Sequence, residues 1–262
     1  MIKKYAKIYK QLVSCAFSSY LSNRIDSLCY FLGKIVRFMF FLFLIISIFR
    51  FTDQMAGYGI YEAILFFLTF NFIDIAAQFL FRGIYVFKRD IISGHFDYIL
   101  SKPANPLFYI MNKMVDILDL SLLVCIAGAL IYNFYLLSDK FSAQSILLYI
   151  FFIANGIILI FTIHVIVAAL SVKFYESDNI GWVYRESVTI GRMPPEIFSD
   201  KVRFIFTYII PIFIMIAFPV KAFLGIIGWS HFFFSLIFTI SLMILSLWFW
   251  QNSLRNYSSA SS

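Results

Sequence analysis

Residues Ile146–Leu170 read ILLYIFFIANGIILIFTIHVIVAAL, a stretch that contains no Asp, Glu, Lys or Arg. About 20 apolar residues in a helix cross the roughly 30 Å hydrocarbon core of a bilayer. The strands of a membrane barrel would alternate apolar and polar residues, and this stretch does not. It therefore predicts a transmembrane helix.

The rest of the chain repeats this pattern. Its 262 residues are 62% hydrophobic and 13% charged, with a mean hydropathy of +0.88, which is outside the range of soluble domains. Five more apolar runs are long enough to span a bilayer: Leu28–Phe49, Tyr58–Phe81, Met114–Leu136, Phe204–Ile226 and Phe232–Trp250. The sequence predicts an all-α polytopic membrane protein, with six transmembrane helices in one domain over residues 28–250 and a short tail over 251–262.

Basic residues are divided unevenly among the segments that join these runs. Sixteen Lys and Arg lie in 1–27, 82–113, 171–203 and 251–262, whereas 50–57, 137–145 and 227–231 hold only Arg50 and Lys140. Cytoplasmic segments are enriched in Lys and Arg. We therefore expect both termini and the two long loops in the cytoplasm, in a multi-pass protein of the plasma (inner) membrane. The net charge of +7 is explained by this topology and by attraction to anionic lipid, and no nucleic-acid partner is expected.

The first 27 residues alternate apolar and basic positions at helical spacing. The apolar positions are Ile2, Tyr5, Ile8, Leu12, Phe17 and Tyr20, and the basic positions are Lys3, Lys4, Lys7 and Lys10. Such a helix lies in the headgroup region with its apolar side toward the lipid. A calmodulin-target helix would share the pattern, but a tethered interfacial helix is the simpler interpretation. No cleavable signal peptide is expected, because the first long apolar run begins only near Leu28.

Segment 171–203 leaves two topologies open. Its charged residues are Lys173, Glu176, Asp178, Arg185, Glu186, Arg192, Glu196, Asp200, Lys201 and Arg203. A lipid-facing span could not hold them, so hydropathy places the segment in the cytoplasm and makes Phe204–Ile226 the fifth span. Alternatively, a helix sheltered by the rest of the protein enters the membrane here and ends at Pro194 and Pro195. The stretch after it, interrupted by Pro211 and Pro219, is then a re-entrant or outer-leaflet element.

Three of the predicted spans carry charged side chains away from their outer ends. Lys34 and Arg37 lie three residues apart on the first span, Asp74 lies on the second, and Asp116 and Asp119 lie three apart on the third. Each pair shares one helix face, and at about 1.5 Å per residue the three sets lie at comparable depths. We expect the two cations to neutralise the three carboxylates in a structural ion-pair cluster. A part in substrate passage or gating and snorkelling to the interface are the alternatives. Glu62 and Lys221 are expected at the outer interface.

Segment 82–113 contains a polar island, residues 89–108, in an otherwise apolar chain. A membrane protein without a large soluble domain has few surfaces for a cytoplasmic partner, so this loop is the candidate contact surface. Gly94 and the prolines suit a short helix followed by a redirected chain. The candidate contact residues are Arg82, Lys88, Arg89, Asp90, Gly94, Asp97, Lys102, Pro103 and Pro106.

No motif indicates catalysis in this chain. The phosphate loop Gly-x-x-x-x-Gly-Lys-[Ser/Thr] is missing, as are His-Glu-x-x-His and Gly-x-Ser-x-Gly. His95, His164 and His231 lie in different segments, and Cys15, Cys29 and Cys125 lack metal or redox spacing and are expected to be packing residues. The chain is expected to be neither an enzyme nor a holder of a metal or cofactor.

The loop sequence carries a family resemblance. Gly94, Asp97, Leu100, Lys102, Pro103, Pro106 and Leu107 form the pattern Gly-x-x-Asp-x-x-Leu-x-Lys-Pro-x-x-Pro-Leu. With the interfacial helix and six spans, this resembles the permease subunits of ABC type 2 exporters, in the branch that has this cytoplasmic loop. A second, weaker block comprises Pro194–Phe198, Pro211 and Phe218–Gly225. The resemblance covers nearly the whole chain.

The resemblance implies partners. The permease is expected to pair with itself or with a sister permease, and two cytoplasmic ATPase subunits, which bind ATP and Mg²⁺, are expected to dock beneath the pair. A coupling helix around Arg82–Gly94 would fit a groove on the ATPase. Family members also have re-entrant helices on the outer side between spans 5 and 6, in conflict with a full span over Phe204–Ile226.

Two other functions fit the sequence less well. A proton-coupled secondary transporter would use Asp74, Asp116 and Asp119 as proton carriers, but no internal hydropathy repeat is detectable, and many such carriers have one. A scaffold or assembly subunit without transport would make little use of buried charge. Drugs, peptides, lipids and glycans all stay open as substrates of an exporter.

Overall fold

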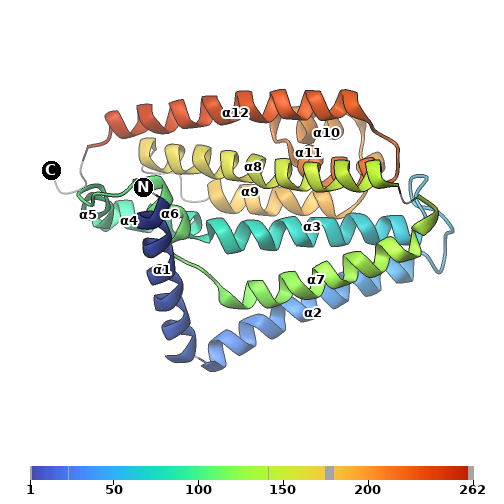
Figure 1. Cartoon of the computed structure of the whole chain (residues 1–262), viewed down its shortest axis with the longest axis horizontal. Helices are drawn as coiled ribbons and strands as arrows, with labels where there is room; N and C mark the ends of the chain where they lie inside the picture. Colours follow the sequence, from blue (N-terminus) through green and yellow to red (C-terminus); the bar gives the residue numbers. More distant parts are fainter. Residues whose placement is uncertain (1, 23, 141, 175–179, 259–262) are drawn as a thin grey trace.

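A computed structural model of the protein describes residues 2–22, 24–140, 142–174 and 180–258. Long helices run side by side in a bundle, and short helices gather at one of its ends (Figure 1). The described part of the chain contains no β-strand. The prediction of an all-α polytopic fold is confirmed.

Five helical segments among the described residues are long and apolar enough to cross a membrane: Ile25–Ile48, Ile60–Ile92, Ile117–Leu136, Ala143–Lys173 and Trp229–Arg255. They contain helices α2 (Arg24–Ile48), α3 (Ile60–Phe81), α7 (Ile117–Leu136), α8 (Ala143–Lys173) and α12 (Trp229–Arg255). These helices correspond to five of the six predicted spans. The start of α1, the end of α12 and the loop after α3 lie at the same end of the bundle (Figure 1), so these basic segments share one end of the molecule.

The sixth predicted span, Phe204–Ile226, is not one straight helix. It contains the end of α10 (Asp200–Phe204), a π-helix η5 (Ile205–Ile209) and α11 (Ile212–Phe223), and the axis turns by 101° between Asp200–Ile209 and Ile212–Phe223. Pro211 stands at the break, where its missing N–H and fixed φ interrupt the helical hydrogen-bond ladder. The segment is therefore either a broken span or a re-entrant element, and it is not the straight span that hydropathy predicted.

Part of segment 171–203 lies inside the bundle. Helix α9 (Ile180–Val188) and the 3-10 helix η3 (Thr189–Arg192) run beside α3 and α8 (Figure 1). The ring of Tyr184 lies 5.4 Å from that of His164 on α8, and the Arg192 guanidinium lies 5.0 Å from the Phe70 ring on α3. Residues 180–192 therefore pack against the long helices, as the alternative of a sheltered helix expects, and neighbouring side chains contact Arg185 and Arg192. Glu176 and Asp178 lie outside the described residues, and so do residues 259–262 of the tail.

Helix α1 (Ile2–Ser22) crosses the end of the bundle where the short helices lie instead of running along the bundle (Figure 1). Its lysines are exposed, whereas Tyr5, Ile8 and Leu12 are half-buried; the side chains of Ile2 and Tyr20 lie outside the description. The Tyr5 ring packs 4.9 Å from that of Phe108, and its hydroxyl accepts a 3.2 Å hydrogen bond from the Asn105 backbone N–H. An interfacial helix would lie in this way. The contact brings α1 against the loop after α3, residues 82–112, which we call the polar loop.

The polar loop folds into short helices that are tightly packed. They are η1 (Arg82–Val86), α4 (Phe87–Ile92), α5 (His95–Leu100) and α6 (Pro106–Asn112). Gly94 joins α4 to α5 with φ +71°, a left-handed conformation that glycine adopts without strain. A Cβ on Gly83 would lie 1.9 Å from the Ile110 carbonyl oxygen, so η1 and α6 touch through their backbones. The loop is a rigid unit at the end of the bundle.

Helix α8 forms the centre of the bundle, between α11, α12 and α3. Phe152, Leu159 and Val165 on α8 are fully buried, as is Met215 on α11. The two helices approach closely because position 156 is glycine: a Cβ there would lie 2.9 Å from the Met215 carbonyl oxygen. Small residues allow such backbone approach in membranes, where van der Waals packing holds helices together.

The α8–α11 contact generates a stability prediction. Gly156→Ala should destabilise the protein by about 1–3 kcal/mol, because the added methyl group displaces the α11 backbone. Thermal unfolding of the detergent-purified protein measures the effect. The matched control is Gly128→Ala on α7, where a Cβ meets nothing within 4 Å and the melting temperature should not fall. Equal losses in both variants would contradict the packing argument.

The inserted position of α9 generates a labelling prediction. In a variant whose three native cysteines are replaced, Ser93→Cys should react with an impermeant maleimide only from the cytoplasmic side, and Ser142→Cys only from the opposite side. Ser187→Cys on α9 should react from neither side. Reaction of Ser187→Cys from the cytoplasm at the rate of Ser93→Cys would restore the hydropathy topology.

Candidate functional site

Four charged side chains from three helical segments form what we call the charge cluster: Lys34, Arg82, Asp116 and Asp119. The Lys34 ammonium contacts both carboxylates, at 3.2 Å for Asp116 and with a shorter contact to Asp119. The Arg82 guanidinium donates to Asp116 at 2.5 Å and to Asp119 at 2.7 Å. Two cations and two carboxylates therefore neutralise one another, as buried charges must.

Local structure fixes each member of the charge cluster. Asp116 is the N-cap of α7 and accepts a 3.0 Å hydrogen bond from the Leu118 backbone N–H, a usual role for Asp at a helix start. Asp119 follows one turn later, with no exposed surface. On the cation side, the Tyr30 ring lies 4.6 Å from the Lys34 nitrogen, close enough for a cation–π contact.

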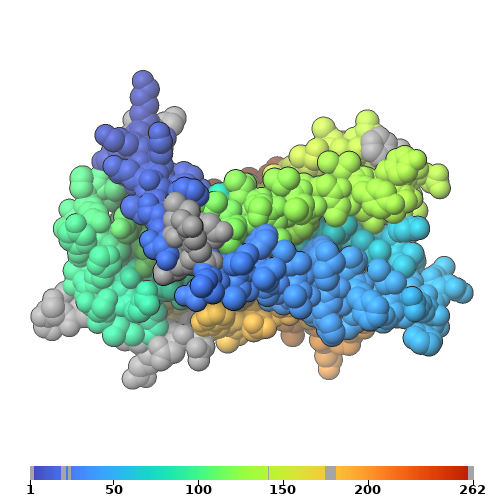
Figure 2. Space-filling view, turned by 90° about the horizontal axis from the view of Figure 1, so that it is seen from below, coloured from blue at the N-terminus to red at the C-terminus, as the bar shows by residue number. Residues whose placement is uncertain are grey.

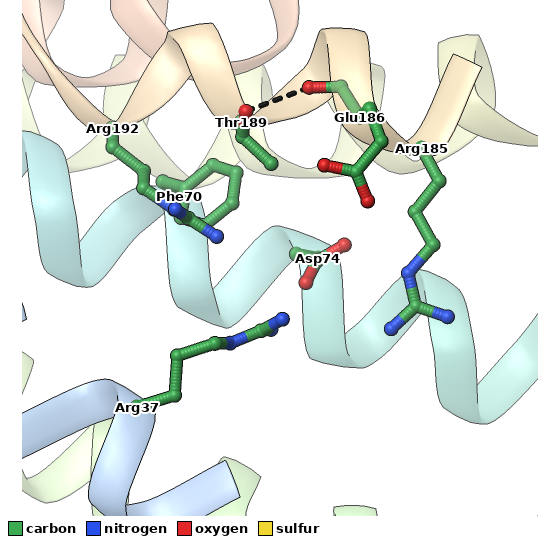
Figure 3. A pocket seen from close by; sticks show the side chains of 7 residues that line it. All are labelled: Arg37, Phe70, Asp74, Arg185, Glu186, Thr189 and Arg192. Carbon is green, nitrogen blue, oxygen red and sulfur yellow. Dashed lines mark hydrogen bonds between the residues drawn. The ribbon is translucent and has the colours of Figure 1, made fainter. Parts of the chain in front are cut away.

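A second group of charges surrounds a cavity of about 240 Å³, which we call the arginine pocket (Figure 3). Its lining residues come from α2, α3 and α9–η3: Arg37, Phe70, Asp74, Arg185, Glu186, Thr189 and Arg192. Asp74 lies near the middle, Arg37 reaches it from α2, and Arg185 and Arg192 flank it from α9 and η3 (Figure 3). The carboxylate of Glu186 points toward that of Asp74 (Figure 3).

Gln78 joins the two groups. Its amide nitrogen donates to Asp74 at 2.8 Å, and its amide oxygen accepts from Arg82 at 3.4 Å and from Arg185 at 3.3 Å. Gln78 is buried, so these polar contacts replace those it would make with water. A continuous polar network therefore runs from the start of α7 to the arginine pocket.

The structure brings together only some of the residues of the predicted ion-pair cluster. Lys34, Asp116 and Asp119 meet as expected, but Arg37 and Asp74 line the arginine pocket instead. Sequence reasoning missed Arg82, which was assigned to the loop surface. The signal was available, because Asp74, Gln78 and Arg82 follow one another at four-residue spacing and so share a helix face.

Arg185 and Arg192 were also missed as site residues. Hydropathy had assigned their segment to the cytoplasm, and no periodicity within 171–203 indicates which helices would shelter it. Arg185 lies 5.6 Å from the Tyr85 ring, and Arg192 lies 4.2 Å from the Phe41 ring. Aromatic side chains from other spans therefore hold these arginines, and only the tertiary structure shows that contact.

The remaining residues predicted for partner contact differ in exposure. Arg89 and Pro103 are exposed, whereas Lys88, Gly94, Asp97, Lys102 and Pro106 are half-buried and Asp90 is buried. Asp90 contacts the Lys113 ammonium. Burial lowers the pKa of Lys113 to about 8, with a further lowering contribution from Arg89. The ion pair holds the loop against the start of α7.

Other charged and metal-binding residue types do not form a further site. No group of three or more His, Cys, Asp or Glu in the described chain could hold a metal ion. His164 is buried on α8, with Nδ1 2.8 Å from the Ile160 carbonyl oxygen. Lys140 pairs with Glu62, and Lys221 pairs with Glu196 at 2.5 Å. The three cysteines are exposed on this chain, so they are not core packing residues of the single subunit.

The charge cluster generates a mutational prediction. Asp119→Asn removes one of two carboxylates that face two cations, so it should destabilise the fold by about 3–5 kcal/mol. Adding Lys34→Met should restore part of the loss, because one cation then faces one carboxylate. Thermal unfolding and the yield of monodisperse protein measure both effects.

An exposed ion pair supplies the control. Asp200 pairs with Arg203 and its side chain is 89% exposed, so Asp200→Asn should change stability by at most about 1 kcal/mol. If Asp119→Asn were as mild as Asp200→Asn, the cluster would not be structural.

Comparison with known proteins agrees with this architecture. A family model described as ABC-2 family transporter protein matches residues 35–261. No curated protein and no solved structure matches the chain. The match includes α3, the polar loop, α9 and the broken helix pair α10–α11, as well as most of α2. Because the family model covers most of the chain, the protein belongs to the ABC-2 family of membrane transporters.

Proposed function

We propose that this chain is the permease subunit of an ABC exporter. It forms the substrate pathway as a dimer, with itself or with a sister permease, and a separate cytoplasmic ATPase drives transport. The observation that carries the proposal is the family match over 35–261. The chain has no phosphate loop, so ATP and Mg²⁺ would bind to the partner, and this subunit would be non-catalytic.

The polar loop is the proposed ATPase contact. It lies at the same end of the bundle as both termini (Figure 1), which the charge asymmetry assigns to the cytoplasm. Ile92 on α4 is 61% exposed and Tyr98 on α5 is 59% exposed, beside the exposed Arg89. Exposed apolar side chains with an arginine are typical of protein interfaces. The Asp90–Lys113 pair and the Gly83 contact would transmit a force on this surface to the spans.

The sequence predicted that Arg82 contacts the cytoplasmic partner, but we propose a different role for it. Its guanidinium is directed into the charge cluster, so it does not offer its charge to a docked ATPase. It links the first residue of the loop to α2 and α7 instead. We propose that Arg82 couples loop movement to the spans, and that Arg89 supplies charge at the surface.

The secondary-transporter alternative loses support from the geometry. Asp116 and Asp119 each contact two cations, so both carboxylates serve as fixed counter-ions within the charge cluster. Asp74 is the remaining candidate, and arginines surround it (Figure 3).

The ATPase assignment is tested by photo-cross-linking in membranes of the producing cells. A benzophenone amino acid at Tyr98 or Ile92 should capture a protein that contains the phosphate loop Gly-x-x-x-x-Gly-Lys-[Ser/Thr], identified by mass spectrometry. In addition, Tyr98→Asp should reduce co-purification of that protein, because a charge on the contact surface disfavours apolar docking.

Phe51 provides the matched control. It is an exposed aromatic residue between α2 and α3, at the opposite end of the bundle, so the same cross-linker there should not capture the ATPase. Capture from Phe51, or from α9 alone, would refute the assignment of the loop.

A further inference from the structure

The arginine pocket has more positive than negative charge. With both carboxylates ionised, Arg37, Arg185 and Arg192 carry three positive charges against the two negative charges of Asp74 and Glu186. No ion pair within 4.0 Å joins any of the three arginines to a carboxylate elsewhere in the described residues. Uncompensated charge at membrane depth is costly and indicates a functional site. A ligand with one negative charge would neutralise the pocket.

The arginine pocket adjoins a larger cavity, which we call the apolar cavity. Its volume is about 390 Å³, within the range of small-molecule sites. It shares Arg37, Asp74 and Arg192 with the arginine pocket. Beyond these shared residues, α2, α3 and α7 line it largely with apolar side chains, including Phe31, Phe38, Phe41, Phe67, Leu122 and Ile126. The two cavities are therefore neighbours, and three charged side chains line both of them.

The apolar cavity reaches an exposed face of the chain. Met39 on α2 lines the cavity and is 55% exposed, and Cys125 on α7 lines it and is also exposed. Helix α2 covers this face of the molecule, with α7 on one side of it and α9 on the other (Figure 2). A membrane-dissolved molecule could enter between α2 and α7 without passing through water.

We infer that the two cavities together bind an amphiphile with one negative charge. Its head group occupies the arginine pocket and its hydrocarbon tail occupies the apolar cavity, and such amphiphiles are the substrate class of the exporter. The inference rests on the proposed function. Arginine suits this head group because its planar guanidinium pairs with phosphate or carboxylate oxygens through two hydrogen bonds. A free inorganic anion would leave the apolar cavity unused, and a cationic amphiphile would face a net positive charge.

Lipid retention by the purified full-length chain tests the binding step. The protein in detergent is mixed with equal amounts of phosphatidylglycerol, which has one negative charge, and zwitterionic phosphatidylcholine with the same acyl chains. Native mass spectrometry then gives the ratio of the two retained lipids. This ratio should favour phosphatidylglycerol, and millimolar inorganic phosphate should not displace it.

Variants with opposite expected effects separate binding from misfolding. Arg192→Gln removes one guanidinium, so it should lower the ratio roughly tenfold. Asp74→Asn removes a negative charge and keeps a polar group beside Gln78, so it should raise the ratio, which a damaged fold would not do. Arg203→Gln removes a partly exposed arginine of α10 and should leave the ratio unchanged.

The results that would overturn the inference are specific. Equal retention of both lipids, a folded Asp74→Asn variant with an unchanged ratio, or displacement by phosphate would each exclude an anionic amphiphile from this site. Retention is measured without the ATPase, so a negative result excludes the proposed lipid site but does not contradict the exporter assignment. The cross-linking experiment tests that assignment separately.

Transport is tested in vesicles that contain the permease with its captured ATPase. ATP should move fluorescent phosphatidylglycerol between leaflets faster than fluorescent phosphatidylcholine, and Arg192→Gln should remove this preference. Head-group-selective retention without ATP-dependent movement would mean that the site holds a structural lipid, and it would overturn the substrate assignment.

Discussion

Compensation of charge inside an apolar bundle is the constraint on which the rest of the structure depends. An isolated ion in hydrocarbon is far more costly than any single packing contact is favourable. The charge cluster meets this requirement by bringing α2, η1 and the start of α7 to one point. These segments are far apart in the sequence, so their common ion pairs set how α2 and α7 sit against α3.

The segment between α8 and α12 shows the same constraint in the backbone. The charged segment α9–η3 can pack along the bundle because aromatic rings of α2, η1 and α8 and the Asp74 carboxylate of α3 lie against its inner side. Its backbone is not continued by a straight helix: η4 (Pro195–Ile197), α10 and the bend before α11 follow. Irregular backbone at membrane depth is tolerated only where protein shelters it. The buried α8–α11 contact at Gly156 is part of that shelter.

The sequence predicted what depends on local pattern. The long apolar runs located α2, α3, α7, α8 and α12, because a spanning helix needs only length and hydropathy. Helix-face spacing and comparable depth also predicted that Lys34 contacts Asp116 and Asp119. The arrangement around Arg185 and Arg192 was not predictable, because hydropathy scores a charge as exposed and the rings of Tyr85 and Phe41 that contact these arginines are one hundred or more positions away. The same limit explains Phe204–Ile226, where the prolines were visible in the sequence but the 101° bend depends on packing.

Arg82 connects the two halves of the proposed mechanism. It begins the loop that would contact the ATPase, yet its guanidinium bonds to Asp116 and Asp119 and approaches Gln78. Gln78 in turn contacts Asp74 and Arg185 at the arginine pocket. The backbone contact at Gly83 prevents η1 from moving independently of α6. A displacement of the loop would therefore have one of two results. Arg82 could move away from its carboxylates and leave unpaired buried charge, or α2 and α7 could move together with the loop. The second course costs less, and it would change the walls of the apolar cavity that α2 and α7 line.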